Sequence, residues 1–272
     1  MFAVLAGFFG FRRFEAIRSE AKESANEVKS LLEEIKQNRD ESRELLQEMA
    51  AESDPEEPEQ ARQKTGDVSN DPGATPMEKE IAEATSLQEQ EKTKDAIRKW
   101  LAIAESAEGT DNSLAARAWF SYGYLQADEN LEEKMRAYDK AIILQPDSAG
   151  AYNNRGIVKA KLGRLVEAIA DYDEAIRLRM PNARAYHNRG LAKARLRRFD
   201  EAITDYDEAI RLQTDYARAY YSRGNSKRAL GRLAEARKDY ESALTLAREE
   251  NDTYRASRIK ELLHQLDTED GN

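Results

Sequence analysis

The chain has 272 residues, and its 43 Lys plus Arg against 52 Asp plus Glu give a net charge of -9. Charged residues make up 35% of it, with only 13 Gly and 6 Pro, a composition that favours helices over an all-β or Rossmann fold. The absence of Cys excludes disulfides and thiolate chemistry, and two His supply too few ligands for a histidine metal site. We therefore expect no metal and no cofactor.

Residues 1–13 form an apolar segment that ends in Arg12 and Arg13. As a helix, the uncharged run up to Phe11 is about 16 Å long, roughly half of the hydrocarbon core, so it cannot span a membrane alone. The positive charge follows the apolar run, which argues against a secretory signal. We expect membrane association on the cytoplasmic side, by a shallow anchor or as the end of a longer spanning helix. The alternative is a soluble cytoplasmic chain.

Residues 14–50 show a heptad pattern. Apolar or small residues alternate at spacings of three and four, which is typical of a coiled-coil helix that pairs with another copy or another protein. A single solvated amphipathic helix is the alternative. The pattern comprises Phe14, Ile17, Ala21, Ser24, Val28, Leu31, Ile35, Asn38, Ser42, Leu45 and Met49.

Residues 51–76 hold four of the six prolines, many acidic side chains and almost no large apolar residue. Such a segment cannot bury enough apolar surface to fold, so we expect a disordered acidic linker.

A repeat of 34 residues dominates the rest of the chain. Residue types recur in register in five columns: Tyr152, Tyr186 and Tyr220; Gly156, Gly190 and Gly224; Ala168, Ala202 and Ala236; Tyr172, Tyr206 and Tyr240; Ala175, Ala209 and Ala243. Each unit reads as two amphipathic helices, for example over 151–162 and 165–178, joined by a turn at Gly163.

These columns resemble the tetratricopeptide repeat, whose W-x2-L-G-x2-Y, A-x3-F and P pattern is met by Tyr152, Gly156, Ala168 and Tyr172. The resemblance implies an all-α, right-handed superhelical solenoid of helix pairs. Its expected units are about 77–110, 115–148, 149–182, 183–216 and 217–250, followed by a capping helix and tail over 251–272.

Three units depart from that pattern in the same way. Each has Arg where an apolar residue is expected, and each has Asp sixteen residues later. The earlier unit has Tyr122 in place of the Arg, and it also has Ala137 in place of the Asp. Since the two residue types occur together, we expect an ion pair between the two helices of each unit. The pairs are Arg155 with Asp171, Arg189 with Asp205 and Arg223 with Asp239.

The resemblance implies that the first helix of each unit lines a concave peptide-binding groove. One stripe and its flanks mix Arg, Asn and aromatic side chains, which suit carboxylates and backbone amides of an extended acidic segment. His187 is expected to be a hydrogen-bonding member of it rather than a metal ligand. The predicted groove residues are Arg117, Phe120, Tyr124, Asn153, Asn154, Ile157, Arg184, His187, Asn188, Leu191, Arg195, Arg218, Tyr221, Asn225 and Arg228.

These features favour a non-enzymatic scaffold that binds a partner protein. Residues 149–250 hold 21 basic and 15 acidic residues, an excess that agrees with an acidic partner, although ordinary solvated faces would look similar. A helical-repeat nucleic-acid binder or a self-assembling structural protein is the alternative, but the chain lacks the dense Lys/Arg stripe that phosphate binding needs, so we expect no nucleic acid. No phosphate-binding loop, dinucleotide fingerprint or nucleophile elbow occurs, which argues against an enzyme.

Overall fold

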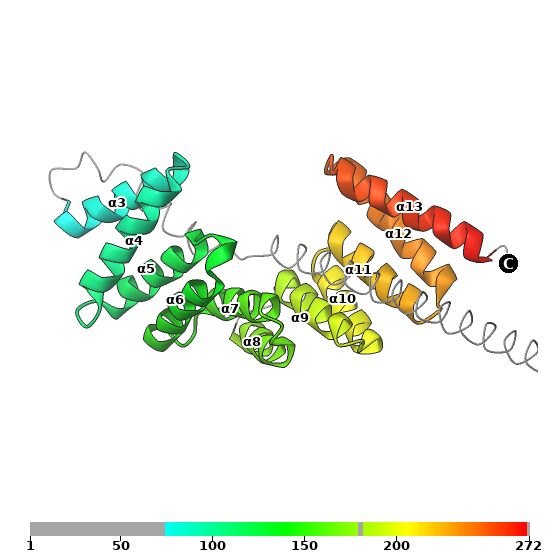
Figure 1. The fold of residues 1–272 in the computed structure, drawn as a ribbon, viewed down its shortest axis with the longest axis horizontal. Helices are drawn as coiled ribbons and strands as arrows, with labels where there is room; N and C mark the ends of the chain where they lie inside the picture. Colours follow the sequence, from blue (N-terminus) through cyan, green and yellow to red (C-terminus); the bar gives the residue numbers. More distant parts are fainter. Residues whose placement is uncertain (1–73, 179–181, 271–272) are drawn as a thin grey trace, which may run out of the picture. The chain divides into compact units, whose positions relative to one another are not determined.

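The computed structural model describes residues 74–178 and 182–270 (Figure 1). Every regular element in those two ranges is a helix. None of the described helices combines the length and apolar character that crossing a membrane requires. The predicted apolar segment 1–13, the heptad segment 14–50 and the linker up to residue 73 lie outside the described residues.

The described helices form consecutive pairs, each helix in contact with the next. The predicted architecture of stacked helix pairs is therefore confirmed. The pairs are α3 (Pro76–Glu89) with α4 (Thr93–Ala107), α5 (Asn112–Leu125) with α6 (Leu131–Leu144), α7 (Ala149–Lys161) with α8 (Leu165–Leu178), α9 (Ala183–Arg195) with α10 (Phe199–Leu212), and α11 (Ala217–Ala229) with α12 (Leu233–Glu249).

A glycine in the first helix lets the two helices of a unit approach closely. A Cβ atom built on Gly190 would lie 2.6 Å from Cε1 of Tyr206, and one on Gly156 equally close to Tyr172. Both tyrosine rings are fully buried. In each unit the glycine backbone and the tyrosine ring therefore pack directly on each other, because any larger side chain at the glycine would displace the ring.

The turn between the two helices of a unit contains one residue whose backbone is in the left-handed conformation, with positive φ. Gly163 and Gly231 have φ of 78° and 72°, and Arg197 has φ of 58° at the same step of the repeat. The next residue closes the turn, since the Arg198 N–H donates to the Lys193 carbonyl at 2.9 Å. Glycine adopts this backbone without steric cost, whereas Arg197 does not.

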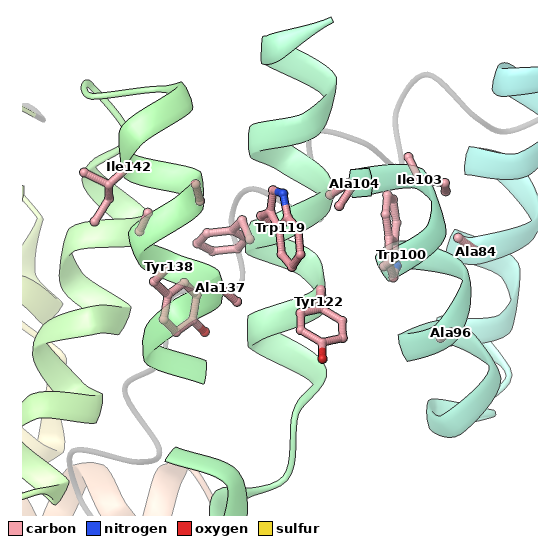
Figure 2. Close-up of a cluster of buried hydrophobic side chains, with 14 of the residues drawn as sticks. Ala84, Ala96, Trp100, Ile103, Ala104, Trp119, Tyr122, Ala137, Tyr138 and Ile142 are labelled. Carbon is pink, nitrogen blue, oxygen red and sulfur yellow. The ribbon is translucent and has the colours of Figure 1, made fainter. Parts of the chain in front are cut away.

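The first units share an aromatic core. Figure 2 shows Trp100, Ala104, Trp119, Tyr122 and Tyr138, which α4, α5 and α6 contribute to one buried cluster. In this part of the chain a short 3-10 turn (η2, Asp128–Asn130) precedes α6.

A final helix, α13 (Thr253–Asp270), packs on α12. Ala256, Ile259, Leu262 and Leu266 are buried against it, and His264 is exposed. Helix α13 thus packs its apolar side chains on the last unit, and its predicted role as a cap of the array stays a prediction.

Candidate functional site

The first helices of the later units lie next to one another. Helix α9 contacts both α7 and α11, in addition to the second helices of its own and the preceding unit. The predicted groove residues lie on α5, α7, α9 and α11, and we call this set of side chains the first-helix face. Because the units repeat, equivalent positions of successive helices are brought into reach of each other.

The predicted groove residues divide into two sets. Arg117, Tyr124, Arg184, Arg195, Arg218, Asn225 and Arg228 are half-buried. Phe120, Asn153, Asn154, Ile157, His187, Asn188, Leu191 and Tyr221 are buried. The long cationic side chains thus keep the greater exposure, and contact of either set with a ligand stays a prediction.

Polar side chains on the first-helix face bond to each other, both within α7 and between units. The Asn188 amide donates to Oδ1 of Asn153 at 3.1 Å, and the Asn153 amide donates to Oδ1 of Asn154 at 3.3 Å. One unit further, Nε2 of His187 lies 3.1 Å from Oγ of Ser222. His187 thus makes a hydrogen bond within the repeat array, and its role in a ligand groove stays a prediction. Ser222 was not predicted, although it stands 34 residues after Asn188 in the same column of the repeat.

Aromatic rings accompany this polar row. The His187 ring lies 5.6 Å from the Tyr206 ring and 5.1 Å from the Tyr216 ring, centroid to centroid. On α5, the Phe120 and Tyr124 rings stack nearly parallel at 6.5 Å. Within the described residues no three His, Asp or Glu side chains gather as metal ligands would. The chemistry of the face is therefore that of hydrogen bonding, ring packing and positive charge.

Arg195 makes a hydrogen bond to the backbone of the preceding unit. Its Nη1 donates to the backbone carbonyl of Ala160, 2.7 Å away on α7, and no carboxylate of the described residues pairs with it. Burial lowers its pKa, as expected for a cation that is partly desolvated without a counter-charge.

The predicted ion pairs within units are confirmed. The Arg155, Arg189 and Arg223 guanidinium groups each hold the buried Asp of their own second helix through two hydrogen bonds, with Nη2 to Oδ1 distances of 2.7, 2.6 and 2.6 Å to Asp171, Asp205 and Asp239. Such two-point pairing suits the planar guanidinium fork.

The structure adds two partners that the sequence analysis missed. Each of these arginines also donates to an Asp of the preceding unit, as Arg189 does to Asp173 at 2.5 Å and Arg155 to Asp139 at 2.8 Å. A lysine one turn further along the first helix binds the same buried Asp, as Lys193 binds Asp205 at 2.7 Å. The columns of these residues were visible in the sequence at the 34-residue step.

We call the resulting chain of charges the Arg–Asp ladder. Each arginine of the ladder joins an Asp of its own unit to an Asp of the preceding unit, and a lysine lies beside each buried carboxylate. The ladder comprises Asp139, Arg155, Asp171, Asp173, Arg189, Asp205, Asp207, Arg223 and Asp239, with Lys159, Lys193 and Lys227. Burial lowers the pKa of Arg189, but hydrogen bonds and charge from Asp205 and Asp173 outweigh this effect and raise the pKa above its ordinary value. The ladder therefore stays charged and ties each unit to the next.

Comparison with known proteins agrees with the fold. The tetratricopeptide-repeat family model matches residues 147–215 and 181–249. A crystal structure of MamA is 23% identical with a TM-score of 0.55, covering 62% of this chain and 96% of that one. MamA 41-end from Desulfovibrio magneticus RS-1 is 17% identical with a TM-score of 0.56, covering 64% of this chain and 96% of that one. At these identities the MamA structures show the fold alone. No curated protein matches the chain.

Proposed function

Because residues 147–249 are tetratricopeptide repeats, we propose that the chain is a non-enzymatic scaffold that binds a segment of a partner protein along the first-helix face. The observation that carries this proposal is the direct contact of α7 with α9 and of α9 with α11. Side chains of these helices also bond across units, so that their polar groups form one row rather than separate sites. A row of this kind suits an extended ligand, which meets one helix after another.

The chemistry of the face favours an acidic partner segment. Its half-buried members include Arg184, Arg195, Arg218 and Arg228, while its Asn side chains offer donors and acceptors to a peptide backbone. Guanidinium groups bind carboxylates in a planar, two-point geometry that a generic positive charge does not provide. The net positive charge of residues 149–250 acts in the same direction.

Capture of partners tests this proposal. The full chain, wild type beside Arg184→Glu/Arg218→Glu/Arg228→Glu, serves as bait in a nuclease-treated lysate, with circular dichroism as the check on folding. Arg177→Glu/Arg211→Glu is the matched control, because these two side chains are 65% exposed on second helices. Selective loss from the triple variant of a partner with an acidic segment supports the proposal. Equal loss from both variants contradicts it, and so does a partner that is captured only from a parallel lysate without nuclease.

The proposal includes attachment and assembly by the first fifty residues. The apolar segment 1–13 would tether the face to a membrane on its cytoplasmic side, and the heptad segment 14–50 would pair copies, so that several faces act together by avidity. Flotation with phosphatidylcholine vesicles tests the tether, with Phe8→Ser/Phe9→Ser as the comparison. Light scattering of a Leu31→Asp variant tests the pairing.

A further inference from the structure

Charged side chains join the turns of successive repeat units. Arg164, in the turn before α8, lies 3.8 Å from Glu132 near the start of α6. Arg232, in the turn before α12, donates to Asp200 near the start of α10 at 2.7 Å. The two residues of each pair are 32 positions apart, so the same step of the repeat meets at both junctions. The turns within successive units therefore lie side by side.

The junction between these two lacks such a pair. The same separation places Val166 at the position opposite Arg198, and Val166 is 71% exposed. Arg198 instead donates to Glu201 of α10, at 2.6 and 2.5 Å. An aliphatic side chain thus stands in solvent at the junction where the carboxylate of the preceding unit is missing.

Positive charge gathers at the same junction. Arg195, Arg197 and Arg198 stand within four consecutive residues. Arg195 bonds to the Ala160 carbonyl of the preceding unit, and Arg197 lies over the Phe199 ring, 5.8 Å from its centroid. Neither of these two pairs with a carboxylate of the described residues. The turn therefore keeps cationic groups that this part of the fold does not neutralise.

The backbone of Arg197 is strained. Its φ is 58°, whereas the turns of the units before and after have Gly163 and Gly231 at the same step. A side chain at positive φ costs conformational energy that glycine avoids. The fold alone would favour glycine here, so the retained arginine points to a role of its side chain outside the packing of the repeat.

We propose that this turn docks on a membrane surface that contains anionic phospholipids. Guanidinium groups would bind the lipid phosphates, and the exposed aliphatic side chains would enter the headgroup region. Leu230, which is 36% exposed on the next turn, extends the aliphatic part. We call this surface the turn patch, and it comprises Val166, Arg197, Arg198 and Leu230.

The charge of these units favours an anionic surface. Residues 149–250 hold 21 basic and 15 acidic residues, and of the acidic side chains next to the turn patch, Asp200 and Glu201 are already paired. Nucleic acid suits the patch less well, because aliphatic side chains gain nothing from a phosphate backbone. Phe199 is half-buried beneath a guanidinium group rather than open to base stacking. The inference does not depend on a ligand of the first-helix face or on segment 1–13.

Flotation with vesicles tests the turn patch. The full chain carries Phe8→Ser/Phe9→Ser in every sample, so that the apolar segment 1–13 does not dominate binding. One set of vesicles is phosphatidylcholine alone, and the other contains about 30% phosphatidylserine. We expect binding that requires phosphatidylserine and that weakens as salt is added, because salt screens the attraction.

Two variants should weaken this binding without harming the fold. Val166→Asp supplies the carboxylate that the neighbouring junctions have, so it should pair with Arg198 and keep or raise the urea midpoint. It should weaken binding at least about tenfold, since it removes the aliphatic contact and adds negative charge. Arg197→Gly should weaken binding about fivefold, the contribution of one arginine near an anionic surface, while raising the midpoint. An arginine with a purely structural role would lower the midpoint when removed.

Each variant has a matched control at another place. Ile143→Asp makes the same kind of change at a residue that is 75% exposed near the C-terminal end of α6. Arg177→Gln removes one positive charge near the C-terminal end of α8, about 16 Å along the helix from Val166 and beyond the Debye length of about 10 Å at 0.1 M salt. Both controls should bind the phosphatidylserine vesicles within about twofold of the parent chain.

Several results would overturn the turn patch. They are flotation that does not require phosphatidylserine, equal losses from Val166→Asp and Ile143→Asp, or a urea midpoint that falls in both patch variants together with binding. A labelled single-stranded RNA that binds the parent chain and is lost from Val166→Asp, while vesicle binding is unchanged, would also overturn it. The scaffold proposal would stand in each case, because its capture test changes other residues.

Discussion

The Arg–Asp ladder gives the most quantitative prediction for this protein. Asp205 is its central buried carboxylate, with a side chain only 3% exposed. Arg189 donates two hydrogen bonds to it, at 2.6 and 3.1 Å, and Lys193 adds a third contact at 2.7 Å. Replacing Arg189 by Leu removes the two-point contact but leaves Lys193 as a counter-charge.

The expected cost follows from those contacts. Breaking a buried pair on one side costs about 3–5 kcal/mol, and the remaining lysine places Arg189→Leu near the lower end, about 3 kcal/mol. The double variant Arg189→Leu/Asp205→Leu removes the buried carboxylate as well. It leaves Lys193, whose long stem can carry the ammonium group to solvent, so we expect a loss of about 1 kcal/mol. Adding Lys193→Met should bring the protein close to wild-type stability.

Urea unfolding followed by circular dichroism at neutral pH measures these differences. Because repeat arrays can unfold in parts, hydrogen exchange of the α9 and α10 amides should report the same order of stability. Arg177→Leu is the control, since it removes an exposed arginine that forms an ion pair with Glu174 three residues before it, and it should leave the midpoint unchanged. A double variant as unstable as Arg189→Leu, or less stable, would refute the argument.

Three further substitutions test the packing and the turns. Arg197→Gly should stabilise the protein by about 1 kcal/mol in urea unfolding, because φ of 58° is strained for any residue with a Cβ. A loss of stability would show that the contacts of the Arg197 side chain outweigh the backbone strain. Gly190→Ala should cost about 1–3 kcal/mol, and adding Tyr206→Phe should not rescue it, because the ring carbons and not the hydroxyl are in contact. Hydrogen bonding to Lys161 lowers the pKa of Asp128 below 3.8, so its stabilisation is present above about pH 4 and is lost as pH falls through the folded-state pKa. Asp128→Asn should therefore cost less than about 1 kcal/mol at pH 7, given the 60% exposed side chain of Asp128, and this cost should shrink as the pH is lowered below 4; a cost that does not change with pH would contradict this.

The sequence by itself determined the helix pairs and the contacts within each unit. The Gly and Tyr columns, the turn near Gly163 and the pairing of Arg189 with Asp205 all lie within one 34-residue repeat. Neighbouring helices in a short hairpin must pack on each other, so residues that recur together at a fixed separation can be assigned to one contact.

Only the tertiary structure decided how successive units meet. Asp173 and Asp205 both lie sixteen residues from Arg189, one on each side, and the stacking of the units lets the arginine hold both. The contacts of Arg195 with Ala160 and of His187 with Ser222 span 35 residues and join different units. Their existence depends on the distance and angle between packed pairs, which the pattern within a single pair does not fix.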